Sequence, residues 1–144
     1  EAAPEQVMMF AAIAKGRALR ANPEVLIVED QLFSAQMLSK LLEPLHKTYI
    51  AANAETAWDI YLKYAPDIVF LDVEMPGTNG HKLANIIRQF DKDSYIIMVT
   101  ASHAAEDIAT ARSNRVNGYI VKPYGKNKIV EAIDKYKTDK KSHR

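Results

Sequence analysis

Side chains able to do chemistry stand where short apolar runs of this sequence end. In the stretch "DIVFLDVEMPG", residues 67–77, four apolar residues lead directly into Asp72. A carboxylate at the end of a buried strand costs free energy unless something there requires it. Other apolar runs end in the same way, and together they deliver Glu29, Asp30, Asp72, Thr100 and Lys122.

The three acids of this set predict a site for a hard divalent cation. Crowded carboxylates repel each other, and their pKa values rise unless a cation lies among them. Mg²⁺ prefers oxygen ligands and retains several waters. We expect Asp30 and Asp72 to bind Mg²⁺ directly and Glu29 to act through water. The backbone carbonyl of Glu74 would supply a further oxygen.

Beside such a cation, Lys122 and Thr100 are suited to bind an anion. Phosphoryl transfer requires mainly positioning and neutralisation of charged oxygens, which a metal ion and a lysine provide. A carboxylate can itself be the nucleophile and form an aspartyl phosphate. Asp72, at the end of the central apolar run, is the candidate.

The elements that must position these residues alternate between strand and helix. Five apolar runs read as strands: Val25–Val28, Tyr49–Ala52, Ile68–Leu71, Tyr95–Val99 and Tyr119–Val121. The segments between them have helical spacing, such as the apolar stripe of Leu32, Met37, Leu38, Leu41 and Leu42. This alternation predicts an α/β fold, a (βα)5 open parallel sheet covered on both faces. Ligands of such sheets bind outside the carboxyl ends of the strands, where the candidate residues stand.

Composition excludes several classes of function. The chain has 144 residues, 48% hydrophobic and 26% charged, with a net charge of +1 and no cysteine. Disulfides and thiolate sites are therefore excluded. No apolar run approaches the ~18 residues of a membrane span, and the N-terminus does not resemble a signal peptide, so we expect a cytoplasmic protein without membrane insertion. Five Lys or Arg against one Asp in residues 135–144 leave the rest mildly acidic, which argues against direct nucleic-acid binding.

The combined pattern resembles the receiver domain of two-component response regulators. The matching segments are the acidic pair in "LIVEDQ", the phosphoacceptor in "FLDVEMPGTNG", the hydroxyl in "VTAS" and the lysine in "GYIVKP". The resemblance implies a flavodoxin-like strand order of 2-1-3-4-5 and a cis peptide at Lys122-Pro123. It covers residues 24–137, leaving 1–23 as an N-terminal helical extension or linker and 138–144 as a basic tail.

The resemblance also implies the roles of the residues. Asp72 accepts a phosphoryl group from a histidine kinase or histidine phosphotransfer protein, with Mg²⁺ held by Glu29 and Asp30. Lys122 pairs with the phosphoryl oxygens, Thr100 moves to bond them, and Tyr119 turns inward as the switch. The protein would be a phosphoacceptor that assists its own phosphorylation and dephosphorylation, not an enzyme. A downstream protein would bind the face formed by the fourth receiver helix (104–116), the fifth strand and the last helix.

Several alternatives stay open at this point. Glu74 occupies a variable position of the family and would either orient or obstruct the water that removes the phosphoryl group. A phosphorylation-independent pseudo-receiver, or the C-terminal receiver piece of a hybrid histidine kinase, would also carry this pattern. The segment 4–21 reads as an extra N-terminal helix, which would rest on the domain, form a homodimer or end a preceding domain.

Overall fold

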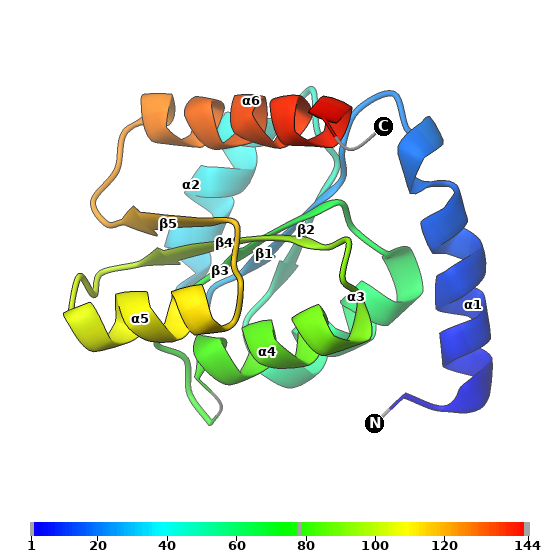
Figure 1. Cartoon of the computed structure of the whole chain (residues 1–144). Coiled ribbons are helices and arrows are strands. Elements are labelled where there is room, and N and C mark those ends of the chain that lie inside the picture. The colour runs from blue at the N-terminus through cyan, green and yellow to red at the C-terminus, as the bar shows by residue number, and fades with distance from the viewer. Residues whose placement is uncertain (1, 78, 143–144) are drawn as a thin grey trace.

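A five-stranded parallel sheet lies between two layers of helices in the computed structural model, which describes residues 2–77 and 79–142 (Figure 1). The strand order is β2-β1-β3-β4-β5, so the predicted order is confirmed. The peptide bond between Lys122 and Pro123 is cis, also as predicted. The strands are β1 (Val25–Val28), β2 (Thr48–Ala51), β3 (Ile68–Leu71), β4 (Tyr95–Thr100) and β5 (Gly118–Val121).

Helices cover both faces of the sheet (Figure 1). On the first face lie α2 (Leu32–Leu42) and α6 (Lys126–Ser142). The opposite face carries α3 (Ala54–Tyr64), α4 (Gly80–Phe90) and α5 (Ala105–Ser113). Each helix follows a strand, as expected for right-handed βαβ connections that place helices on both sides of a parallel sheet.

The central strands are apolar throughout because both of their faces are buried. Alternate side chains of β1 enter two separate cores: Val25 and Ile27 pack on the side of α2 and α6, whereas Leu26 and Val28 pack on the side of α3 and α4. These four side chains are almost completely buried. Burial on both faces therefore explains why the runs read as continuous rather than alternating patterns.

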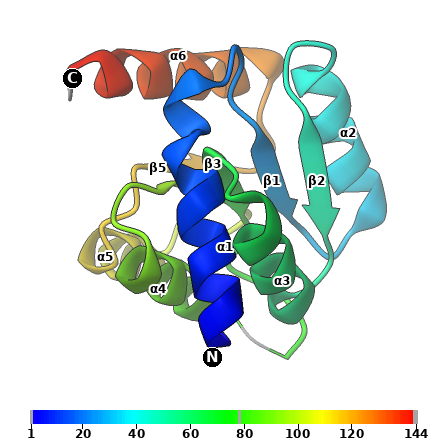
Figure 2. The same ribbon diagram turned by 90° about the vertical axis from the view of Figure 1, so that its right-hand side faces the viewer.

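The N-terminal segment forms the extra helix α1 (Pro4–Lys15) and a short 3₁₀ turn, η1 (Arg17–Leu19). Helix α1 lies across the outside of α3, away from the sheet (Figure 2). Phe10 is its buried residue, stacked on Tyr61 at 5.6 Å and edge-on to Phe90 at 4.9 Å between ring centroids. Aromatic pairs of this kind stabilise beyond their buried area. The helix therefore rests on the domain in this structure, while a role in a homodimer or as the end of a preceding domain stays a prediction.

Two arginines, in η1 and directly after it, hold the N-terminal extension against the domain. Arg17 forms an ion pair with Asp91 (2.8 Å). Arg20 bonds Asp67 (2.8 Å) and donates to the carbonyl oxygens of Tyr64 and Ala65, at the end of α3. The last carbonyls of a helix lack partners within it, so Arg20 satisfies the C-terminus of α3.

Three features differ from the sequence expectations. The first helix ends at Lys15, before Gly16, instead of continuing to residue 21. Helix α6 extends to Ser142, so residues 138–142, expected as part of a basic tail, are helical, and residues 143 and 144 lie outside the described residues. Leu32 and Met37 are 61% and 51% exposed instead of facing the core. In the described part of the chain, no helix is both long and apolar enough to cross a bilayer.

Candidate functional site

The register of the sheet brings the ends of β1, β3, β4 and β5 to one edge. Val28 pairs with Leu71, and Thr100 pairs with Val121. The backbone pairing continues one residue further, because the Asp72 N–H donates to the Val28 carbonyl at 3.1 Å. In the same way the Lys122 N–H donates to the Thr100 carbonyl at 2.8 Å. The residues that follow these strands are therefore held by the sheet itself.

Three carboxylates meet at this edge. Glu29, Asp30 and Asp72 each offer an oxygen, and these oxygens lie within 4.8 Å of one another. Glu29 and Asp72 are buried, whereas Asp30 is exposed. The Gln31 N–H donates to Glu29 Oε2 (3.2 Å), and the Glu74 N–H donates to Asp72 Oδ1 (3.2 Å). The two buried acids are thus fixed by the backbone of the loops that follow them.

Lys122 reaches into this cluster from β5. Its Nζ donates to Asp72 Oδ2 at 3.0 Å and to Glu29 Oε1. Burial lowers the pKa of Lys122, but its bonds to Glu29 and Asp72 outweigh burial and hold that pKa above its ordinary value. Burial raises the pKa of Glu29, and the bond from Lys122 opposes that rise. One ammonium against three carboxylates leaves the cluster with excess negative charge.

The donor set fits a hard divalent cation. All three side chains offer oxygen, and their mutual spacing allows one ion to contact each of them. The excess negative charge favours a second cation beside the lysine. The Glu74 peptide lies against Asp72 through its N–H, while ligation by the Glu74 carbonyl stays a prediction. The Glu74 side chain is exposed.

Thr100 and Tyr119 lie on the neighbouring strands, beside the acids. Thr100 is completely buried, and its Oγ1 accepts from the Ser102 N–H at 3.3 Å. The Tyr119 ring is half-buried, and its hydroxyl donates to the Ser102 carbonyl at 2.9 Å. Burial raises the pKa of Tyr119, with a further contribution from the charge of Asp107. The sheet therefore brings the three predicted acids and Lys122 into one cluster, with Thr100 and Tyr119 on the adjoining strands β4 and β5.

An open depression of about 650 Å³ lies outside the cluster. Acids line it, namely the exposed Asp30 and Glu74 and the half-buried Asp107. Part of its lining, Val73 to Pro76 and Asn79, precedes Gly80, the first residue of α4, where a Cβ would stand 2.0 Å from the Asp72 carbonyl oxygen. Only glycine lets the start of α4 approach the backbone of Asp72 so closely.

Ser102, Asp107 and His81 form a polar chain that sequence reasoning missed. Ser102 Oγ donates to Asp107 Oδ2, and His81 Nε2 lies 2.9 Å from Asp107 Oδ1. Hydrogen bonds from Ser102 and His81 hold the pKa of Asp107 below its ordinary value. His81 and Asp107 are 26 positions apart and on different helices, so no local spacing could have paired them.

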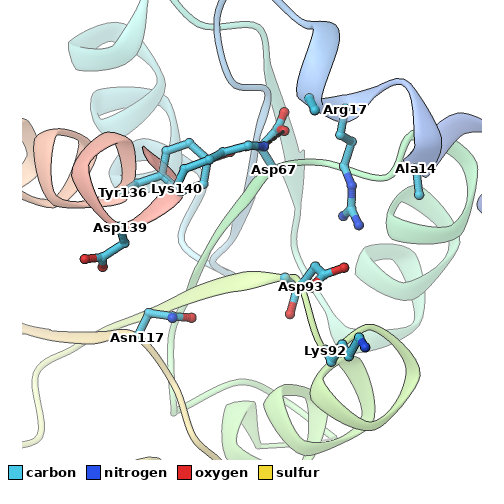
Figure 3. Close-up of a pocket in the computed structure, with 11 residues that line it drawn as sticks. Ala14, Arg17, Asp67, Lys92, Asp93, Asn117, Tyr136, Asp139 and Lys140 are labelled. Carbon is cyan, nitrogen blue, oxygen red and sulfur yellow. Dashed lines mark hydrogen bonds and ion pairs between the residues drawn. The ribbon is translucent and has the colours of Figure 1, made fainter. Parts of the chain in front are cut away.

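A second hollow, of about 430 Å³, lies at the other edge of the sheet, between η1 and α6 (Figure 3). Asp67, Ser94 and Asn117 line it, and each directly precedes a strand, so the hollow is remote from the acid cluster. The residues that line it carry charges of both signs. Two of them are already in ion pairs, Arg17 with Asp91 and Asp67 with Arg20. The basic residues lie among the acidic ones, with Lys92 beside Asp93 and Lys140 Nζ 4.0 Å from Asp67 Oδ1.

Comparisons with known proteins agree with this geometry. The family model described as "Response regulator receiver domain" matches residues 25–134. The chemotaxis protein CheY of Halobacterium salinarum is 34% identical over 113 residues, covering 76% of this chain and 92% of that protein. The sporulation initiation phosphotransferase F of Bacillus subtilis is 29% identical, covering 80% of this chain and 94% of that protein.

Solved structures show the same fold. A CheY-like response regulator receiver domain protein from Methanospirillum hungatei superposes with a TM-score of 0.80. The match covers 85% of this chain and 99% of that one, at 22% sequence identity. The part of this chain that lies outside the family match includes α1 and η1.

Proposed function

The chain belongs to the response regulator receiver domain family, and on that premise we propose that Asp72 accepts a phosphoryl group in a two-component phosphorelay. The donor is the phosphohistidine of a histidine kinase or histidine phosphotransfer protein. A single observation carries the proposal: Asp72 lies among two further acids and a lysine at the carboxyl edge of the sheet. The assignment of residues 24–137 to the receiver, with 1–23 as an extension, is part of the same proposal.

The residues present fit Mg²⁺ as the cofactor. Asp30 and Asp72 would bind it directly, Glu29 through water, and the Glu74 carbonyl would complete the protein ligands. When bound, Mg²⁺ neutralises the phosphoryl oxygens and the surrounding acids. The spacing and excess charge of the acid cluster support this assignment.

Asp72, Lys122 and Thr100 have different roles in the transfer. A carboxylate oxygen of Asp72 forms a bond to phosphorus while the bond from phosphorus to the donor histidine nitrogen breaks. The electron pair of that bond stays on the nitrogen, and a proton on the other ring nitrogen makes the leaving imidazole neutral. Lys122, now bonded to Asp72 Oδ2, is placed to follow the charge onto the phosphoryl oxygens. Thr100 would donate its hydroxyl to another of these oxygens, which requires it to leave its bond with the Ser102 N–H.

Movement of Thr100 would be read out at the face of α5, β5 and α6, through Tyr119. The Tyr119 hydroxyl is bonded to the carbonyl of Ser102, two residues after Thr100, so a shift of this loop when Thr100 moves would change how far the ring turns inward. A downstream protein that binds this face would sense the ring position. We place this exchange in the cytoplasm, with no direct contact to nucleic acid, and a homodimer as one form of the partner.

An exposed apolar patch beside the acids suits docking of a protein donor. It consists of Leu32, Phe33 and Met37 on α2, which are 61%, 75% and 51% exposed. The patch begins two residues after Asp30, at the start of α2. Large apolar side chains grouped at such a site favour a protein interface over open solvent.

The proposal is tested by the intact mass of the protein after incubation with acetyl phosphate. We expect one phosphoryl adduct in the wild type with Mg²⁺, no adduct without Mg²⁺, and none in Asp72→Asn. If the folded wild type takes no phosphoryl group and also fails to bind beryllofluoride with Mg²⁺, the proposal is overturned in favour of a pseudo-receiver. An adduct in Asp72→Asn would place the phosphoacceptor elsewhere.

A further inference from the structure

Ser102 contacts both residues of the proposed switch. Its N–H donates to Thr100 Oγ1 at 3.3 Å, and its carbonyl accepts from the Tyr119 hydroxyl at 2.9 Å. The position of this one residue therefore determines whether both contacts can form. Whatever holds Ser102 also holds Thr100 and Tyr119.

The Ser102 side chain is fastened to α5. Its Oγ donates to Asp107 Oδ2 and accepts from the Ala104 N–H at 3.3 Å. Asp107 lies in the first turn of α5, and its other oxygen, Oδ1, is 2.9 Å from His81 Nε2 on α4. A single carboxylate thus joins the loop after Thr100 to two helices.

His81 is itself held close to the phosphoacceptor. The imidazole is buried, and the His81 backbone carbonyl accepts from Asn114 Nδ2 at 2.9 Å. The preceding residue, Gly80, packs against the Asp72 carbonyl and donates its N–H to the Val73 carbonyl at 2.7 Å. The chain of contacts from Asp72 therefore runs through His81 and Asp107 and returns to Ser102.

The imidazole of His81 has one polar partner among the described residues. Its Nδ1 is buried and makes no hydrogen bond there, whereas Nε2 faces Asp107. A buried ring nitrogen without a partner is unfavourable, so packing alone does not account for a histidine at this position. The bond to Asp107 is the interaction that a leucine or phenylalanine could not replace.

We propose that His81, Asp107 and Ser102 form a latch that positions Thr100 and Tyr119 in the unphosphorylated protein. This inference rests on the proposed function of Asp72. Asp107 and His81 are positioning residues, because they act on Thr100 through Ser102. When Thr100 moves toward a phosphoryl group it loses its contact with the Ser102 N–H, which the latch holds in place, so the latch opposes phosphorylation and its removal favours it.

A simpler role for Asp107 would be its charge alone. Asp107 lines the same depression as Asp30 and Glu74, and a carboxylate there repels an anionic donor. The two roles differ in what Ser102→Ala does, since that change breaks the latch without changing any charge. They differ again in the double variant, because residues that act as one unit give non-additive effects.

The test compares rates of phosphorylation by acetyl phosphate with Mg²⁺ in Ser102→Ala, Asp107→Ala and the double variant. We expect each single change to raise the rate by at least about threefold and the double variant to add little more. Glu106→Gln, an exposed neighbour of Asp107 on α5, is the control for loss of one negative charge and should leave the rate unchanged. Acceleration by Asp107→Ala alone, with Ser102→Ala at the wild-type rate, would overturn the latch.

Amide hydrogen exchange measures the latch independently of phosphorylation. In Asp107→Ala we expect faster exchange at the amides of Ser102 and Ala104, with unchanged exchange at Ile97 in the sheet. Unchanged exchange at both loop amides would contradict the latch. If the wild type takes no phosphoryl group, the proposed function fails, and exchange alone decides whether the latch holds the loop.

Discussion

Lys122 Nζ lies 3.0 Å from Asp72 Oδ2 and also donates to Glu29 Oε1, so one ammonium bridges two buried acids that follow different strands. The bridge compensates part of the charge that these two carboxylates bring to the ends of core strands. Asp30, the third acid of the cluster, lies on the exposed side of this bridge. The lysine and a divalent cation therefore act on the same carboxylates.

Lys122→Met separates the effect of the lysine on these carboxylates from the effect of the divalent cation. Without the ammonium the acids carry more net negative charge, so we expect Mg²⁺ to bind severalfold more tightly in a calorimetric titration. Phosphorylation by acetyl phosphate should slow by at least about tenfold, because the phosphoryl oxygens lose a charged donor. Lys126→Met, at an exposed position of α6, should change neither quantity. Unchanged Mg²⁺ affinity in Lys122→Met would contradict the bridge as described.

Gly80→Ala tests the close contact between α4 and the phosphoacceptor. The added Cβ would lie 2.0 Å from the Asp72 carbonyl oxygen, so α4 or Asp72 must shift. We expect the free energy of unfolding to fall by about 2 kcal/mol, and the phosphoryl adduct to decrease with it. The matched control is Gly125→Ala, where a Cβ has no heavy atom within 4 Å. Equal stabilities of the two variants in denaturant titrations would refute this reading.

Phe33→Ala tests the apolar patch on α2. Phe33 is 75% exposed, so its loss should change stability by less than about 0.5 kcal/mol. We expect transfer from a phosphohistidine-bearing phosphotransfer protein to slow by about fivefold or more, and the reaction with acetyl phosphate to be unaffected. Met8→Ala, at a 73% exposed position of α1, serves as the control. Equal transfer rates in the wild type and Phe33→Ala would remove the patch from the donor interface.

The ion pair of Arg17 with Asp91 predicts a pH dependence of stability. Burial raises the pKa of Asp91, but hydrogen bonds from Arg17 and Tyr61 outweigh it and lower the pKa below the ordinary 3.8. A carboxyl whose pKa is lower in the folded protein stabilises the fold at pH values above its pKa in the unfolded chain. This contribution is lost as the pH falls through the pKa of the folded protein. Asp91→Asn should lower the free energy of unfolding by about 2 kcal/mol at neutral pH.

The difference between Asp91→Asn and the wild type should shrink as the solution is acidified. Denaturant titrations from about pH 5 down to about pH 3 would follow this change. Asp93→Asn, an exposed neighbour in the same loop, should parallel the wild type throughout. A constant difference between Asp91→Asn and the wild type across this range would show that the pair does not titrate as described.

Most of the fold and the acid cluster could be predicted from the sequence because their signals are local. Continuous runs such as Val25–Val28 mark strands buried on both faces, and the residue that ends each run lies at the ligand-binding edge. The resemblance supplied the strand order and the switch residues. The sheet then places Asp72, Glu29 and Lys122 together, as the sequence predicts.

What could not be predicted depends on contacts between distant segments. His81 and Asp107 meet only because α4 and α5 lie side by side on one face of the sheet. The helical spacing of apolar residues placed Leu32 and Met37 in the core. Spacing alone cannot distinguish an apolar residue that packs in the core from one that is exposed. The docking of α1 depends on Phe10 meeting rings of α3 and α4, which no local pattern specifies.

The central claim, that Asp72 is the phosphoacceptor, is tested most directly by locating the modified residue. Borohydride reduces an acyl phosphate to an alcohol, so a phosphorylated aspartate becomes homoserine, which peptide mass spectrometry identifies. After incubation with acetyl phosphate and Mg²⁺, we expect homoserine at position 72 and unmodified Asp30 and Glu29. Reduction at Asp30 or Glu29, or an adduct that yields no homoserine at position 72, would contradict it.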